Sequence, residues 1–143
     1  LHSCALFTTR RFPGGDHGGN YLEIQHGWKL HGFWDDQISD EATYKAIRNG
    51  AESIGKDPRL VAAGKKAAEK LDPGDWIDES FELAKRVVYT KEVLDKVAAR
   101  EAHSHLAPLD LSDEYKTQAE AVSEQRAVEA GYRLAGTIHE LLP

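Results

Sequence analysis

Helix-capping residues recur along the chain after residue 28, and they limit the fold more than any other feature. An Asp, Ser or Thr side chain accepts hydrogen bonds from the free amides of a first helical turn, and proline fits the first helical position. The predicted caps are, in chain order, Ser39 or Asp40, Asp57-Pro58, Asp72-Pro73, Thr90 and Ser112. The helices that they predict cover about 29–38, 41–54, 58–71, 73–87, 91–103 and 113–142.

Two segments depart from this simple pattern. Residues 1–28 are rich in glycine and contain Gly18-Gly19-Asn20, a turn signal, followed at 21–24 by the apolar–polar alternation of a short strand. In the last helix the apolar stripe thins around residues 124–126, which leaves open a kink or break. The expected fold class is therefore mainly α, a multi-helix fold with a short β-hairpin or ribbon near the N-terminus.

Composition narrows the classes of function. The length of 143 residues corresponds to a single domain, and the 41% of hydrophobic residues can form a core. A net charge of −6 argues against a broad basic face for nucleic acid, but not against an enzyme that grips phosphate through bound metal. No apolar run approaches the ~20 residues that span a bilayer, so no stable membrane association is expected. The single Cys4 excludes an internal disulfide.

The sharpest local feature is the pair His31 and Asp35 within the run Leu30-His31-Gly32-Phe33-Trp34-Asp35. Residues four apart lie on one face of a helix, so an imidazole and a carboxylate placed in this way can close on one cation. Taken alone, this spacing is more often a surface ion pair or a hydrogen-bonded core pair. Trp34 could serve as a platform for a base, but beside such a pair it is better explained as a core anchor.

Several motifs together carry a resemblance to a known family. They are Leu1-His2, the loop ending in Gly18-Gly19-Asn20, the strand at 21–24, Leu30-His31 with Trp34-Asp35, the run 76–89, and the run 130–135. In this combination the chain resembles the zinc-dependent, single-strand-specific nucleases of the mung bean nuclease type, which share a fold with bacterial zinc phospholipase C. One departure is Lys29, where the family commonly has Asn.

The resemblance implies that His2, His31 and Asp35 bind one zinc of a trinuclear cluster, with no catalytic residue beyond the metal ligands. It implies hydrolysis of single-stranded DNA or RNA to 5′-nucleotides, and a secreted or periplasmic location. The likeness covers only the family's second half. Residues 1–143 are therefore interpreted as the C-terminal half of a larger nuclease-like domain, whose missing N-terminal segment is an expected partner. The chain alone is expected to be inactive.

Other residues receive weaker assignments. Asn20 is a candidate for contact with substrate, and Arg10-Arg11 form a basic loop that could guide a phosphate chain. Asp16 and His17 are expected to face solvent. Two alternatives to the nuclease stay open: a phospholipase C-like lipid hydrolase with the same ligands, and a non-catalytic helical binding module in which His31 and Asp35 serve structure only.

Overall fold

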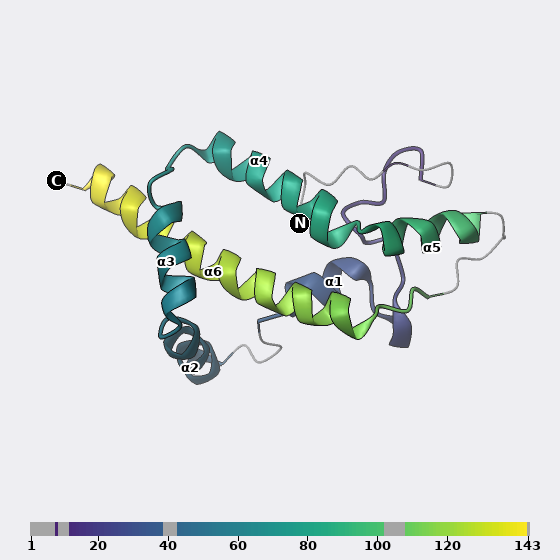
Figure 1. Ribbon diagram of the computed structural model, residues 1–143, viewed down its shortest axis with the longest axis horizontal. Helices are drawn as coiled ribbons and strands as arrows, with labels where there is room; N and C mark the ends of the chain where they lie inside the picture. The colour runs from purple at the N-terminus through teal and green to yellow at the C-terminus, as the bar shows by residue number, and fades with distance from the viewer. Residues whose placement is uncertain (1–7, 9–11, 39–42, 102–107, 143) are drawn as a thin grey trace. The chain divides into compact units, whose positions relative to one another are not determined.

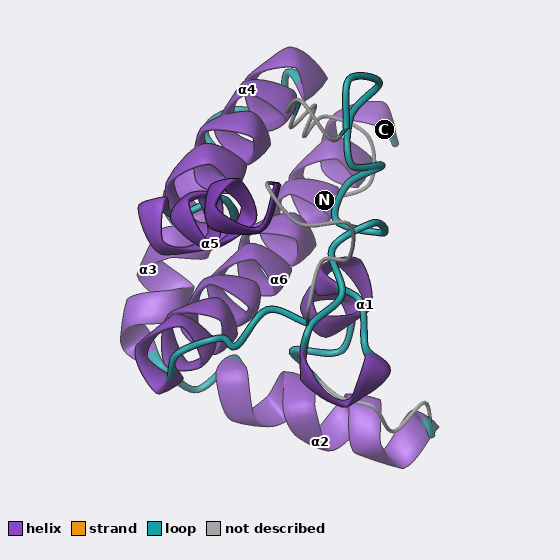
Figure 2. Ribbon diagram, turned by 90° about the vertical axis from the view of Figure 1, so that its right-hand side faces the viewer, coloured by secondary structure: helices purple, strands orange, loops and turns teal. Residues whose placement is uncertain are grey.

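The computed structural model describes residues 8, 12–38, 43–101 and 108–142 of the chain. This part is mainly helical (Figure 1), as the sequence predicts, and Figure 2 shows helices and loops with no strand in it. The helices are α1 (Leu30–Asp35), α2 (Tyr44–Ile54), α3 (Pro58–Ala67), α4 (Pro73–Leu83), α5 (Lys91–Glu101) and α6 (Asp113–Leu141), with the 3-10 turn η1 (Gln25–Gly27) and the π-helical turn η2 (Ala84–Val88).

Four of the predicted caps are confirmed by the hydrogen bonds that they accept. The carboxylates of Asp57 and Asp72 accept from backbone amides two residues ahead, at 2.8 and 2.6 Å. The hydroxyls of Thr90 and Ser112 accept from amides three residues ahead, at 3.3 and 3.2 Å. The cap predicted for the second helix is wrong, because Thr43 accepts from Ala46 N at 3.2 Å and α2 begins after it. Ser39 and Asp40 lie outside the described residues.

Helix ends differ from prediction at α1, which ends at Asp35 rather than near residue 38, and after α3 and α4. α3 ends at Ala67 rather than near residue 71. After α4 the chain widens into η2, where the amide of Tyr89 donates to Ala84 O at 2.9 Å, five residues back. The wider turn buries three successive residues, at 87, 88 and 89, which one face of a regular α-helix cannot do. α6 is one continuous helix through residues 124–126, so the helix does not break there.

The predicted N-terminal ribbon is reduced to two isolated bridges in the described residues. Glu23 pairs antiparallel with Lys29 around η1, and Ile24 pairs parallel with Leu109. Backbone hydrogen bonds support both, from Ile24 N to Trp28 O at 2.8 Å and from Leu109 N to Glu23 O at 2.7 Å. The segment before α1 is thereby tied to the segment before α6.

The chain divides into two compact units, and the boundaries fall inside α4 and α6. The first unit comprises Leu1–Asp35 and Trp76–Ala119; the second comprises Asp36–Asp75 and Glu120–Pro143. The first unit contains one continuous apolar core, formed by Leu22, Ile24, Leu30, Ala84, Val88, Tyr89, Val93, Val97, Leu109, Leu111 and Tyr115. The prediction of one domain, itself half of a larger one, stays a prediction.

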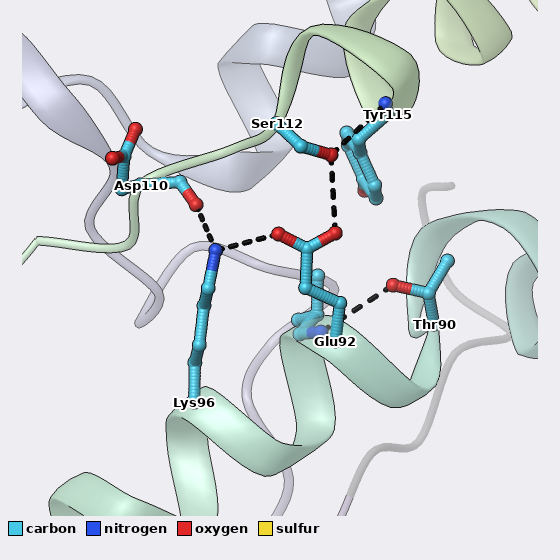
Figure 3. A network of polar contacts seen from close by, with 7 residues as sticks. Thr90, Glu92, Lys96, Asp110, Ser112 and Tyr115 are labelled. Carbon is cyan, nitrogen blue, oxygen red and sulfur yellow. Dashed lines mark hydrogen bonds and ion pairs between the residues drawn. The ribbon is translucent and has the colours of Figure 1, made fainter.

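A polar network in the first unit joins α5 to the start of α6 (Figure 3). The Glu92 carboxylate accepts from Lys96 Nζ at 2.6 Å and from Ser112 Oγ at 3.1 Å. Lys96 also donates to the carbonyl of Asp110. Because Ser112 is the cap of α6, the carboxylate fixes the point where this helix begins.

The second unit is held by few buried residues. Gly64, Ala67, Val128, Glu129 and Arg133 are buried there. The guanidinium Nε of Arg133 donates to Ala67 O at 3.2 Å, which joins the later part of α6 to the end of α3. Across the parts of the chain that the structure describes, no helix combines the length and the apolar character needed to cross a membrane.

Candidate metal site

The side chains of His31 and Asp35 meet on one face of α1. The imidazole Nε2 lies 3.2 Å from Asp35 Oδ2, with the histidine side chain 16% exposed and the carboxylate 43% exposed. Helical spacing alone brings the two groups within reach of each other. The pair therefore stands at the surface of the first unit, with one nitrogen and one carboxylate oxygen directed to a common point.

The second nitrogen of His31 fixes the tautomer of the ring. Nδ1 lies 3.0 Å from the carbonyl oxygen of Gly18. A carbonyl can only accept, so Nδ1 carries a hydrogen and donates it. In a neutral ring Nε2 then holds a lone pair, and this lone pair faces a carboxylate oxygen. The lone pair and the carboxylate oxygen, 3.2 Å apart, are then placed to bind one cation between them.

These two side chains are of the types that bind zinc. Imidazole nitrogen and carboxylate oxygen are both common zinc ligands, and a ligating histidine usually donates its other N–H to a carbonyl or a carboxylate. The third predicted ligand, His2, lies outside the described residues. Among the residues that are described, no group of three or more His, Cys, Asp or Glu side chains could hold a metal ion. The described residues thus bring together two of the three predicted ligands.

The loop that supplies the Gly18 carbonyl is anchored to the core of the first unit by the buried side chain of Asp16. Asp16 is 0% exposed, and Tyr89 Oη donates to its Oδ2 at 2.7 Å. Burial raises the pKa of Asp16 above its ordinary value, more than the hydrogen bond from Tyr89 and the nearby amides lower it. Burial likewise raises the pKa of the Tyr89 phenol, so that it keeps its proton and donates. The expectation that Asp16 faces solvent is wrong; its neighbour His17 is exposed, as predicted.

Trp34 anchors the other side of the same helical turn. Its indole Nε1 donates to Tyr115 Oη at 3.0 Å, and Tyr115 Oη donates in turn to Val88 O at 2.9 Å. Trp34 also packs against the apolar core of the first unit. The interpretation of Trp34 as a core anchor is confirmed, and a role in stacking on a base is not needed to explain it.

The candidate substrate residues remain less defined. Asn20 is exposed, and its side-chain amide donates to His17 O at 2.9 Å within the turn. Its proposed contact with substrate stays a prediction. Arg10 and Arg11 lie outside the described residues.

The sequence analysis does not identify Tyr89 and Tyr115, whose hydroxyl groups hydrogen-bond to Asp16 and to Trp34 near His31 and Asp35. The available signal was weak. Each tyrosine stands next to a predicted boundary, Tyr89 just before the cap Thr90 and Tyr115 in the first turn after Ser112. Nothing in the spacing connects either residue to the run that contains His31.

Comparison with known proteins gives one match. The family model described as S1/P1 Nuclease matches residues 1–143. Searches among curated proteins and among solved structures found no match to the chain.

Proposed function

Since the chain belongs to the S1/P1 nuclease family, a nuclease-type phosphodiesterase, we propose that it acts with zinc on single-stranded DNA or RNA and releases 5′-nucleotides. The metal ligands in this proposal are His2, His31 and Asp35. Membership of the family gives the class of reaction, and the zinc dependence and the strand preference are the proposed part.

The observation that carries the proposal is the orientation of His31. A ring that donates Nδ1–H to Gly18 O at 3.0 Å and directs Nε2 at a carboxylate oxygen 3.2 Å away is prepared for a cation. A purely structural ion pair does not require the carbonyl contact on the far side of the ring. That contact is typical of histidines that ligate metal, because it fixes the tautomer and raises the basicity of the ligand.

Each of the chain's own residues then has a defined task. Bound zinc would supply Lewis-acid activation of water and neutralise charge on the phosphate. His31 and Asp35 hold the cation at the surface of the first unit, where a phosphodiester can approach. A chain of net charge −6 gains a local positive site in this way without a basic face. Asn20, Arg10 and Arg11 are the proposed contacts to the nucleic acid.

The family likeness also supports a secreted or periplasmic location. Zinc is one of the metals that suit a mixed nitrogen and oxygen ligand set with an open position, and the family resemblance favours it. Single-stranded nucleic acid is the proposed substrate because the motifs of the chain resemble those of single-strand-specific nucleases.

The test is ligand substitution in the full-length protein, with a matched histidine as control. His31→Ala and Asp35→Asn should each lower the bound zinc, measured by elemental analysis, and abolish release of nucleotides from single-stranded DNA. His139→Ala removes an exposed histidine near the end of α6 and should change neither. Full zinc content together with retained turnover in His31→Ala would show that the ligand assignment is wrong.

A lipid assay run in parallel distinguishes the nuclease from a phospholipase C-like hydrolase. Release of choline phosphate from a phosphatidylcholine emulsion should stay at background for the wild type. Lipid turnover that exceeds nucleotide release would show that the same site serves a phospholipase C-like lipid hydrolase. An absence of bound zinc in the wild type would favour the non-catalytic binding module.

A further inference from the structure

We propose that Asp16 and Tyr89 form a positioning pair for His31, acting through the loop between residues 16 and 19. The buried carboxylate, held by the phenol, fixes the loop so that the carbonyl of Gly18 meets the imidazole. This inference rests on the proposed metal site, because a fixed ring orientation has a use only if the ring binds a ligand. Neither residue touches the cation; both act through Gly18.

The burial of Asp16 is the first support. An acidic side chain that is 0% exposed loses its hydration, and the phenol of Tyr89 at 2.7 Å, with the nearby backbone amides of the loop, compensates this loss only in part. The other oxygen, Oδ1, is buried and has no hydrogen-bond partner among the described residues. A buried acidic side chain kept under such conditions is best explained by what it holds in place.

The shape of the loop is the second support. His17, Gly18 and Gly19 have φ angles of 54°, 66° and 91°, all in the left-handed region. Glycine adopts such angles freely, but a positive φ is uncommon for a non-glycine residue such as His17 and is kept where surrounding contacts determine it. The carbonyl of Asp16 accepts from Tyr21 N at 3.1 Å and closes the loop, while the Asp16 side chain ties it to the core. The loop thus has a fixed base.

The contact between the loop and α1 is the third support. A Cβ atom on Gly19 would lie 3.0 Å from His31 N and 3.3 Å from Leu30 Cβ, so the loop lies directly on the first turn of the helix. The Gly18 carbonyl reaches His31 Nδ1 from this position. A small displacement of the loop would therefore lengthen the hydrogen bond and release the ring.

The position of Tyr89 is the fourth support. Tyr89 follows directly after η2, and the carbonyl of Val88 in that turn accepts from Tyr115, which binds Trp34. Two successive residues therefore hold the two flanks of one helical turn, one through Asp16 and one through Tyr115. π-helical turns of this kind recur at functional sites, where they redirect the side chains that follow.

The experiment compares Tyr89→Phe and Asp16→Asn with wild type in the zinc-free, full-length protein. The readout is the tautomer of His31, taken from the nitrogen chemical shifts of its ring by NMR. Wild type should show one tautomer with hydrogen on Nδ1; the variants should show a mixture. In a second readout, competition with a chelator, zinc affinity at this site should fall about 10-fold, the low end of the range for groups that orient metal ligands.

A control variant separates positioning from loss of stability. Val97→Ala truncates a core residue of the first unit that is 1% exposed and has no polar group in its side chain. It should lower the free energy of unfolding and leave the His31 tautomer unchanged. If Tyr89→Phe fails to fold, Gly19→Ala displaces the loop from the side of α1 and should produce the same mixture of tautomers.

The outcomes divide cleanly. An unchanged His31 tautomer in Tyr89→Phe, Asp16→Asn and Gly19→Ala overturns the positioning pair, even if zinc binds as proposed. A mixture of tautomers supports the pair. In a third outcome, wild type binds no zinc while the variants lose the single tautomer. This result would reject the proposed metal but still support Asp16 and Tyr89 as a pair that positions His31.

Discussion

The two units of the molecule are stabilised in different ways. In the first unit, apolar side chains from η2, α5, the start of α6 and the segments before α1 and α6 form one continuous core. In the second unit, large apolar side chains are exposed: Tyr44 is 79% exposed and Leu134 is 62% exposed. Its polar contacts include Arg133 Nε to Ala67 O, which joins α6 to α3, and Arg126 to Glu129 at 2.5 Å within α6.

This difference explains why the candidate site lies in the first unit. Metal ligands need side chains whose orientation is fixed by packing and by supporting hydrogen bonds. His31 and Asp35 have both, because Leu30 and Trp34 between and beside them are held by the apolar core. The second unit, with fewer buried residues, offers no comparable support among its described side chains. The contrast can be tested with pairs of identical substitutions, three of them with one member in each unit and one within the second unit.

Leu109→Ala and Leu134→Ala should show the largest contrast. Leu109 is 2% exposed in the first unit, and its truncation should lower the free energy of unfolding by about 3 kcal/mol, since a cavity adds to the lost burial. Leu134 in the second unit is exposed, so the same change should stay within about 0.5 kcal/mol. Urea denaturation of the full-length protein measures both. Equal losses would mean that the face of the second unit is covered, and the comparison would then fail.

Tyr115→Phe and Tyr44→Phe test the polar contacts of the first unit. Removal of the Tyr115 hydroxyl leaves the Val88 carbonyl and the Trp34 indole N–H without their partner, at a cost of about 2 kcal/mol. Tyr44→Phe changes an exposed phenol in the second unit and should have almost no effect. Thermal unfolding monitored by circular dichroism would show the difference. A loss below about 0.5 kcal/mol in Tyr115→Phe would mean that water replaces the phenol.

The features that could be predicted from sequence are those with short-range causes. Asp57, Thr90 and Ser112 cap helices by accepting hydrogen bonds from amides two or three residues ahead. The residues next to each cap are therefore enough to predict it. His31 and Asp35 meet for the same reason, because four residues make one helical turn. The mainly α fold and the contact between His31 and Asp35 were accordingly open to prediction from local patterns.

The features that could not be predicted depend on contacts between distant residues. Tyr89 and Asp16 are 73 residues apart, and Trp34 and Tyr115 are 81 apart. No periodicity links such pairs, so Asp16 was expected at the surface although it is fully buried. Phe81 shows the reverse case. A large aromatic side chain is expected in the core, yet Phe81 is 41% exposed, with Lys85 Nζ 5.2 Å from its ring centroid.

Gly64→Ala and Gly131→Ala should change the stability of the second unit in opposite directions. A Cβ on Gly64 in α3 would lie 2.4 Å from Tyr132 Cδ2, so the ring must move, and the strain should outweigh the gain in helix propensity by about 1 kcal/mol. At Gly131 in α6, no atom lies within 4 Å of such a Cβ among the described residues. Alanine should stabilise the helix there by about 0.5 kcal/mol or more. Stabilisation by Gly64→Ala would show that α3 and α6 do not pack closely.

Glu92→Gln should give the smallest effect and depend on pH. The hydrogen bond from Lys96, and then that from Ser112, lower the pKa of Glu92 below its ordinary value of 4.5. A lowered folded pKa gives stability that is present above the unfolded pKa and is lost as pH falls through the folded one. Because the side chain is 40% exposed, the difference between wild type and variant at pH 7 should be only about 0.4 kcal/mol.

The dependence of that difference on pH carries more information than its size. The gap between wild type and Glu92→Gln should close as pH falls below about 4.5, where the wild-type carboxylate takes up its proton. Glu52→Gln is the matched change in the second unit, where the ion pair with Arg48 lies within α2 alone and joins no second element. It should cost less at pH 7, since Glu92 also fixes Ser112 at the start of α6. If Glu52→Gln is the more destabilising, then single-helix ion pairs matter more to this chain than the junction drawn in Figure 3.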